Sequence, residues 1–169
     1  MHSAERPTDY TGAATLPLVL AAPSLASAST ATDVTFAYSA SGSTVSNTIT
    51  NNSGGALQCS TSLGDAPGGV LPTIEDTMGP GQTIYESGVI PTGTTVQTIN
   101  DISDGSYVVL ASCVSVDEPT SMWVSDYPGL EPYLAMFPYT TYAVQQASWV
   151  VTLPAAGTPD AAADVNFGS

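Results

Sequence analysis

The stretch Asp104-Gly-Ser-Tyr-Val-Val-Leu-Ala-Ser-Cys-Val-Ser-Val116 decides the fold class of this chain. From residue 106 onward, apolar side chains occupy both sets of alternating positions, so a strand built from them is apolar on both faces. A strand of that kind lies in the interior of a sheet, where both of its faces are covered. The turn formers that precede it, residues 101–105, read DISDG. We therefore predict a central strand over residues 106–116.

Six other stretches have the composition or the two-residue period of strands: 33–39, 44–50, 56–63, 82–89, 94–100 and 147–153. The turn formers Asn51-Asn-Ser-Gly-Gly55 predict a hairpin between 44–50 and 56–63. Residues 64–81 are rich in Gly and Pro and predict a surface connection with one short strand near 70–74. With 15 Gly, 13 Pro and no helical period of useful length, the 169 residues predict an all-β domain of about seven strands.

The N-terminal region has the pattern of a secretory signal. Residues 13–28 read AATLPLVLAAPSLASA and end in Ala26-Ser27-Ala28, which fits the small-residue cleavage rule. We predict a signal peptide over 1–28, a single domain over 29–153 and a loose tail over 154–169, with no membrane span after removal of the signal. Against this interpretation, Arg6 is opposed by Glu5 and Asp9, and the alternative is an Ala-rich arm on a cytosolic protein.

Cys59 and Cys113 are the two cysteines of the chain. In an exported protein they predict a disulfide, which on the loop-closure model removes roughly 4 kcal/mol of unfolded-chain entropy. The alternative is a pair of buried free thiols. Residues 29–169 contain no histidine, so a four-ligand zinc site is excluded and we predict no metal site.

The charge distribution excludes several classes of function. The net charge is −14, and Arg6 and His2 are the only basic side chains. Residues 29–169 keep thirteen acids and no cation, so they lack the groups that neutralise phosphates, and nucleic-acid binding is excluded. Without His or Lys there is no base for a catalytic serine and no Schiff-base amine. We predict a protein that is not an enzyme and uses no cofactor.

Carboxylates leave two alternatives open. The pairs Glu75-Asp76 and Asp117-Glu118 are the candidates for a carboxylate-dependent hydrolase, since two suitably spaced acids suffice for glycoside hydrolysis. Asp101, Ser103 and Asp104 could supply oxygen ligands to calcium, although turn formation is the simpler role of these residues.

The most unusual segment is a predicted insertion, about residues 117–146, before the last strand. It is far longer than an ordinary hairpin loop and, apart from its ends, nearly free of charge. Its aromatic composition is typical of surfaces that bind partners or sugar rings. The alternative is an insertion that folds back on a sheet and buries its aromatics, with residues 133–137 as a short strand or a helical turn. The candidate ligand-binding residues are Trp123, Tyr127, Tyr133, Phe137, Tyr139 and Tyr142.

Two stretches resemble immunoglobulin-like domains of secreted proteins of the actinobacterial type: residues 44–59, TVSNTITNNSGGALQC, and residues 104–113, DGSYVVLASC. The resemblance covers about residues 33–153 and implies an antiparallel β-sandwich. The chain departs from antibody domains because no Trp follows Cys59 at core spacing, and because Tyr107 precedes Cys113 by six residues rather than two.

These features together predict a secreted or cell-surface module, not an enzyme, that binds a protein or another ligand. The main alternative is an extracellular carrier of an apolar small molecule or a carbohydrate that uses the aromatic insertion. The small acidic antibiotic carriers of actinobacteria, which have an immunoglobulin-like scaffold, are similar in this respect. A carboxylate hydrolase is the enzyme alternative.

Overall fold

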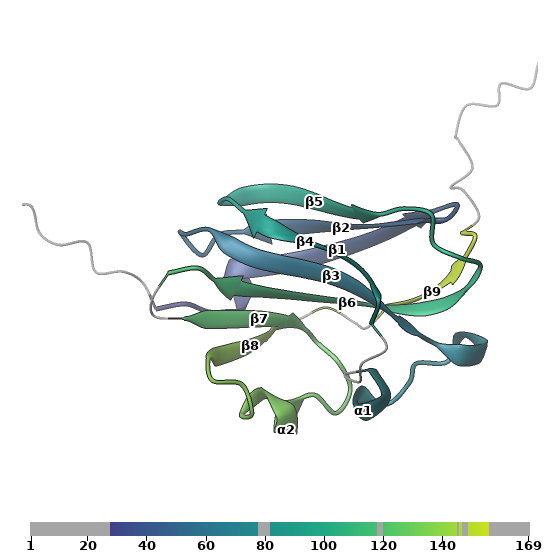
Figure 1. Cartoon of the computed structure of the whole chain (residues 1–169). Coiled ribbons are helices and arrows are strands. Elements are labelled where there is room, and N and C mark those ends of the chain that lie inside the picture. Colours follow the sequence, from purple (N-terminus) through teal and green to yellow (C-terminus); the bar gives the residue numbers. More distant parts are fainter. Residues whose placement is uncertain (1–27, 78–81, 118–119, 145, 147–148, 156–169) are drawn as a thin grey trace, which may run out of the picture.

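The computed structural model describes residues 28–77, 82–117, 120–144, 146 and 149–155. Within these residues the chain forms nine strands (Figure 1): β1 Val34–Ser41, β2 Thr44–Asn51, β3 Leu57–Asp65, β4 Ile84–Ile90, β5 Gly93–Ile99, β6 Gly105–Ser115, β7 Ser121–Ser125, β8 Thr140–Val144 and β9 Trp149–Leu153. The helices are short: η1 Ala31–Asp33, η2 Pro67–Gly69, α1 Ile74–Thr77 and α2 Glu131–Leu134. The prediction of an all-β protein is confirmed, with nine strands rather than about seven.

The strands form two sheets that pack face to face (Figure 1). The smaller sheet has the order β1-β2-β5 and is antiparallel throughout. The larger sheet has the order β4-β3-β6-β7-β8, and β9 also pairs with β6. Its pairs are antiparallel except for β7 and β8, which run parallel. This arrangement is the predicted β-sandwich.

The prediction that residues 106–116 form a central strand is confirmed. β6 pairs with β3 from Tyr107 to Ser115 along one side. On its other side it pairs with β9 over Gly105–Val109 and with β7 over Ser112–Val114. Consecutive residues Val108 and Val109 are both fully buried, because one faces each side of the sheet and both sides are covered.

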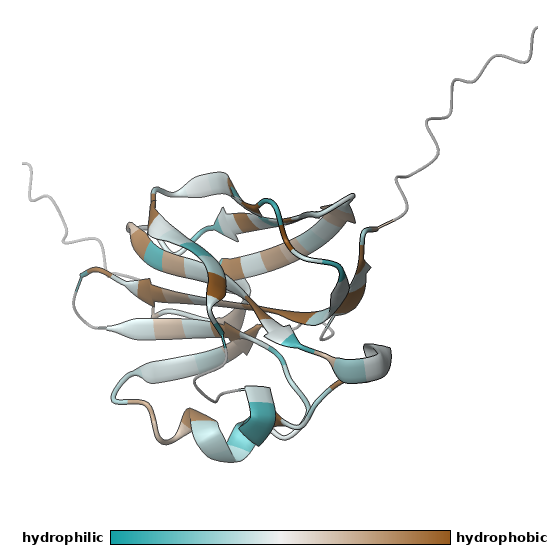
Figure 2. Cartoon of the chain, turned by 45° about the vertical axis from the view of Figure 1, so that its right-hand side comes forward, coloured by the Kyte–Doolittle hydropathy of each residue, from teal (hydrophilic) through white to brown (hydrophobic). Residues whose placement is uncertain are grey.

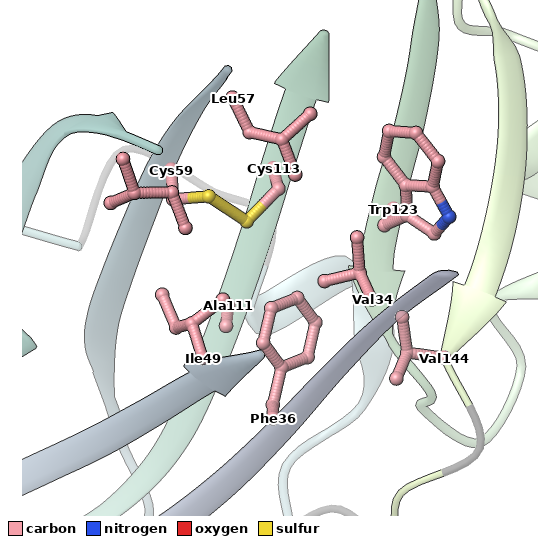
Figure 3. Packing of buried hydrophobic residues seen from close by; sticks show 10 residues of the cluster. Val34, Phe36, Ile49, Leu57, Cys59, Ala111, Cys113, Trp123 and Val144 are labelled. Carbon is pink, nitrogen blue, oxygen red and sulfur yellow. A yellow bond between two sulfur atoms is a disulfide. The ribbon is translucent and has the colours of Figure 1, made fainter. Parts of the chain in front are cut away.

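The core between the sheets is built from alternating positions of strands in both layers. Figure 2 shows hydrophobic residues recurring along the strands with hydrophilic ones between them. Figure 3 shows the packing itself, in which side chains of β1 and β2 meet those of the larger sheet. The buried residues of this cluster include Val34, Phe36, Ile49, Leu57, Cys59, Ala111, Cys113, Trp123 and Val144. At ~25 cal/mol per Å² of apolar surface, their burial is the main force that holds the two sheets together.

The predicted disulfide between Cys59 and Cys113 is confirmed, with an S–S distance of 2.03 Å. The two cysteines are register partners on β3 and β6, which are neighbours in the larger sheet. Both side chains face the core and are fully buried (Figure 3). The bridge therefore fastens two strands within one sheet, and packing of side chains joins that sheet to the other.

A short layer of buried polar groups also crosses the core. Thr61 Oγ1 accepts a hydrogen bond from Asn47 Nδ2 at 2.9 Å and donates one to Gln97 Oε1 at 2.7 Å. Gln97 Nε2 in turn donates to the carbonyl of Cys59 at 3.1 Å. Asn47 and Gln97 belong to the smaller sheet and Thr61 to the larger one, so these bonds fix the position of one sheet relative to the other.

The predicted hairpin between residues 44–50 and 56–63 is wrong. β2 pairs with β1 and β5, whereas β3 pairs with β4 and β6, so the chain crosses from one sheet to the other at residues 52–56. The buried side chain of Asn51 holds this crossing, because its Nδ2 donates to Gly55 O and Pro91 O while its Oδ1 accepts from the Ser53 amide. The observed hairpin joins β1 to β2, where Gly42 adopts a positive φ of 55°.

The short strand predicted near residues 70–74 is also wrong. Residues 70–73 belong to no strand, and Ile74 begins helix α1. Thr73 opens this turn, since its Oγ1 donates to Asp76 Oδ2 at 2.9 Å. In the described part of the chain, no helix is both long enough and apolar enough to cross a bilayer.

Candidate functional site

The predicted insertion, about residues 117–146, is folded back on the larger sheet. Its two strands, β7 and β8, extend that sheet beyond β6, and helix α2 lies between them. Residues 133–137 form no strand, and the first two of them belong to the helical turn α2, Glu131–Leu134. The insertion therefore adds both to the sheet and to the layer that covers it (Figure 1).

Trp123 and Tyr142 lie on the core side of this extension. Trp123 is fully buried and stacks on Tyr142, with 5.8 Å between ring centroids. Each ring donates to the N-terminal segment, Trp123 Nε1 to Thr30 O and Tyr142 Oη to Ser29 O, both at 2.8 Å. Trp123 therefore has no surface that a ligand could contact. This agrees with the alternative in which the insertion folds back on a sheet and buries its aromatics.

Tyr127, Tyr133 and Phe137 lie on the opposite, outward face of the larger sheet. Tyr127 is 3% exposed, and its hydroxyl donates to Pro72 O at 2.6 Å and accepts from Thr77 Oγ1 at 3.1 Å. Tyr133 donates to Glu75 Oε1 at 2.6 Å. These bonds join the segment around α1 to the segment around α2, and the two helices lie together beneath the sheet in Figure 1. We call residues 70–77 and 126–137 the covering segments.

A second apolar cluster lies between the outward face of the sheet and the covering segments. Val108 of β6 and Val124 of β7 are buried there against Ile74, Tyr127 and Leu130. The sequence contained a signal for this cluster, since β6 is apolar on both faces and its outward face has to be covered by something. It gave no indication that residues near 74 and 130 supply the cover.

The cover is incomplete and leaves a cavity of about 260 Å³, which we call the outer hollow. It brings together Tyr127 and Phe137, which were predicted, with residues that were not. Tyr133 and Tyr139 do not line it; Tyr133 links the covering segments and Tyr139 is 40% exposed. Among the described residues that line the outer hollow, none has an acidic or basic side chain. The residues that line it are Ser62, Ile74, Gln82, Leu110, Ala111, Ser112, Met122, Val124, Ser125, Tyr127, Leu130 and Phe137.

The floor of the outer hollow includes Leu110, Ala111 and Ser112 of β6. On this side of β6, β9 pairs up to Val109 and β7 pairs from Ser112, while residues 147 and 148, which precede β9, lie outside the described residues. Ser125, the last residue of β7, accepts a hydrogen bond at its Oγ from the Ala111 amide at 3.0 Å.

Tyr38, from the smaller sheet, packs against the core between the sheets, with its hydroxyl near Ser125. The hydroxyl is buried and makes no hydrogen bond of ordinary geometry with a described residue. Burial raises the pKa of Tyr38 far above its ordinary value, and the Ser125 side chain opposes part of that shift. The Tyr38 ring is held in place by stacking on Trp149 at 6.1 Å.

Two further cavities lie near the covering segments and have acidic side chains in their walls. One of about 650 Å³ is lined partly by Asp126 and Glu131, and one of about 250 Å³ partly by Asp65 and Asp76. Within the described residues, no group of three or more His, Cys, Asp or Glu side chains is arranged to hold a metal ion.

The carboxylates that formed the sequence-based alternatives have local structural partners. Glu75 binds Tyr133 and Asp76 binds Thr73, while Asp101 adopts a positive φ of 56° as turn residues do. Asp117 is described, but its neighbour in the second candidate pair, residue 118, lies outside the described residues.

One pair of side chains between the covering segments has shifted pKa values. The hydrogen bond from Tyr133 holds the pKa of the Glu75 carboxyl below its ordinary value, because that bond stabilises the ionised form. The same bond, with the charge of Glu75, raises the pKa of Tyr133. Both side chains are at the surface, so water screens the interaction.

The chain matches no protein-family model, no curated protein and no solved structure. Its function is therefore inferred from the geometry of the outer hollow and from the composition of the chain.

Proposed function

We propose that this chain is a secreted binding module, not an enzyme, and that the outer hollow receives a small ligand. The observation that carries the proposal is the cavity of about 260 Å³ between the central strand and the covering segments. Binding sites for small molecules are concave, mostly apolar, and contain a few polar groups that orient the ligand. The outer hollow has this composition, with Leu110, Met122 and Phe137 among its apolar residues and three serines among its polar ones.

The lining favours binding over catalysis. General acid–base chemistry needs a group that exchanges protons near the working pH, and the described residues that line the outer hollow include no carboxylate, imidazole or amine. The one phenol in its wall, Tyr127, has its hydroxyl engaged by Pro72 and Thr77.

The same lining favours an apolar ligand over a carbohydrate. A sugar carries many hydroxyl groups, and each of them needs a hydrogen-bonding partner when it is buried. Among the described residues of the wall, Gln82 is the one amide, and both ends of its side chain are engaged within the protein, with Ser62 and with Thr77 O. Few groups remain that could satisfy a sugar ring.

Export is supported by the leader pattern and by the buried disulfide, since structural disulfides persist in oxidising compartments. A carrier outside the cell also has to stay in solution when it is empty. The excess of acids over bases, which gives the chain its net charge of −14, serves that purpose.

The proposal is tested by screening the oxidised chain, labelled on its methionine methyl groups, against a panel of small molecules by NMR. Met122 lines the outer hollow, so a ligand bound there shifts its resonance. Leu110→Trp fills the hollow and should abolish the shift. Val89→Trp, a matched change on the exposed outward face of β4, should leave it intact.

Two results would contradict the proposal. One is a panel in which no compound shifts the Met122 resonance. The other is binding that Leu110→Trp leaves unchanged, because the ligand would then lie elsewhere on the molecule. Thermal unfolding of both Trp variants verifies that they fold.

A further inference from the structure

The strands of the smaller sheet contain no charged residue, although the whole chain has a net charge of −14. β1 reads VTFAYSAS, β2 reads TVSNTITN and β5 reads GTTVQTI. Copies of so acidic a chain repel one another, because almost no cation is present to offset the acids. The smaller sheet is a place where a second copy can approach without meeting a like charge.

The strand β5 forms one margin of the smaller sheet (Figure 1). It pairs with β2 along one side and, among the described residues, with no strand along the other. The N–H and C=O groups of an unpaired edge are a template for another strand, and proteins usually protect such edges with charged residues or proline. The seven residues of β5 include neither, so this edge is open to strand addition.

Two other edges of the sandwich are protected. On β4, Glu86 is the register partner of the core-facing Thr61, yet its side chain is exposed. A charge on the inward side of an edge strand is a known obstacle to pairing with another strand. Directly after β1, Gly42 exchanges backbone hydrogen bonds with Ala155, so the chain beyond β9 lies against that end of the sheet.

Val96 lies at the midpoint of β5, on the outward face of the sheet, and is 56% exposed. In a two-fold dimer the same strand of each copy pairs antiparallel with the other, and the residue on the axis lies opposite its own equivalent. Pairing of β5 over its full length puts Val96 on the axis and Thr94 opposite Thr98 of the second copy. Pairs of apolar β-branched residues and pairs of threonines both stabilise neighbouring strands.

We infer that two copies of this chain pair antiparallel through β5, with Val96 on the two-fold axis, and join their three-stranded sheets into one continuous sheet. The partner is therefore a second copy of the chain, held by backbone hydrogen bonds along an uncharged edge. The outer hollow lies on the outward face of the larger sheet, so this inference does not depend on the proposed function.

Sedimentation velocity of the oxidised chain over a range of concentrations tests the association. We expect monomers to convert to dimers as the concentration rises. Added salt should increase the dimer fraction, because the Debye length falls from about 30 Å at 0.01 M to about 8 Å at 0.15 M and the repulsion between the copies is screened. Dissociation by salt would overturn the inference, since ion pairs would then hold the copies together.

The variant Val96→Lys tests the position of the interface. It puts two like charges opposite each other on the axis and should raise the dissociation constant about tenfold, through the loss of a favourable cross-strand pair and the gain of an unfavourable one. Val89→Lys makes the same change of charge at an exposed valine on the outward face of β4 and should keep the dimer. An equal effect of the two variants overturns the inference, and melting temperatures verify that both fold.

Cysteine variants test the register. Val96→Cys should form a disulfide between copies, because directly opposed residues of antiparallel strands have Cα atoms about 4.5–5.5 Å apart, within the range of a disulfide. Thr94→Cys and Thr98→Cys should each remain unlinked alone and form a disulfide with each other when mixed. The native bridge between Cys59 and Cys113 is fully buried, which shields it from exchange.

Two further results would overturn the inference. One is a Thr94→Cys variant that links to itself as readily as Val96→Cys does, because the strands would then have another register. The other is a chain that remains monomeric at every concentration, which would leave the β5 edge to a strand of a different protein.

Discussion

Thr61 is the residue on which the polar layer of the core depends. Its hydroxyl bonds to both Asn47 and Gln97, and all three side chains are buried. A buried polar group that loses its partner retains the full cost of its desolvation. The stability of the sandwich should therefore be sensitive to this one hydroxyl.

We predict that Thr61→Val, which keeps the shape and removes the hydroxyl, lowers the free energy of unfolding by about 2 kcal/mol or more. Both Asn47 Nδ2 and Gln97 Oε1 lose their partner in this variant. Urea unfolding measures the change. The control Thr48→Val, on the outward face of β2, should stay within about 0.5 kcal/mol of the unaltered chain, and equal stability of the two variants would refute the prediction.

At the scale of elements, α1 and α2 are single helical turns that have no stability of their own. They are held over the larger sheet by Ile74 and Leu130 and by the bonds of Tyr127 and Tyr133 to the α1 segment. Glu75 and Tyr133 both have shifted pKa values, so a change of pH acts directly on the hydrogen bond between them and on the contact between the covering segments.

The direction of this pH effect follows from the two shifts. The pKa of Glu75 is lowered by folding, so its contribution is present above the ordinary carboxyl pKa, about 4.3, and is lost as the pH falls through the lower folded value. The pKa of Tyr133 is raised, so its contribution is present below about pH 10 and is lost as the pH rises through the higher folded value.

We therefore predict that the ring resonances of Tyr133 titrate in acid with a midpoint below about 4.3, the ordinary pKa of Glu. NMR of the ring protons across the acid range measures this midpoint. The titration should vanish in Glu75→Gln and persist in Glu86→Gln, which changes an exposed residue of β4. A Tyr133 signal that still titrates in Glu75→Gln would show that another group controls this contact.

The elements also show what local sequence can predict. The run from Tyr107 to Ser115 predicted a central strand because its two-sided apolar pattern has one simple explanation. The turn formers at residues 51–55 led to the wrong prediction of a hairpin, because Asn, Ser and Gly residues suit both a hairpin and a crossing between sheets. The contact that decides between them joins Asn51 to Pro91, forty residues away, and no local pattern reveals it.

The candidate site was predictable only in part for the same reason. The aromatic composition of the insertion indicated an unusual region, and Tyr127 and Phe137 do line the outer hollow. Which face each aromatic occupies depends on the register of β7 and β8, which sets Trp123 against Tyr142. Such short strands leave too few alternations in the sequence to define that register.

At the scale of the whole molecule, the Cys59–Cys113 disulfide closes a loop with a sequence separation of 54 residues. This loop contains β4, which belongs to the larger sheet, and β5, which belongs to the smaller one. The bridge therefore restricts a segment of the unfolded chain that has to contribute strands to both layers.

We predict that the double variant Cys59→Ala, Cys113→Ala unfolds with a free energy about 4 kcal/mol lower than that of the oxidised chain. Guanidinium unfolding of both proteins measures the difference. The reduced parent chain serves as control and should be destabilised to a similar extent. A loss below about 1 kcal/mol would mean that the unfolded chain is already compact around these strands.

The attachment of the N-terminal segment imposes an order on the assembly of this molecule. The carbonyl of Thr30 accepts its hydrogen bond from the indole of Trp123, 93 positions later in the chain. The carbonyl of Ser29 accepts one from the phenol of Tyr142, 113 positions later. A ribosome or an export channel releases the beginning of the chain long before those rings emerge, so this end of the sandwich cannot close during early synthesis. For the export proposed above, this delay would keep the chain unfolded, the state in which a polypeptide can be threaded through a membrane pore.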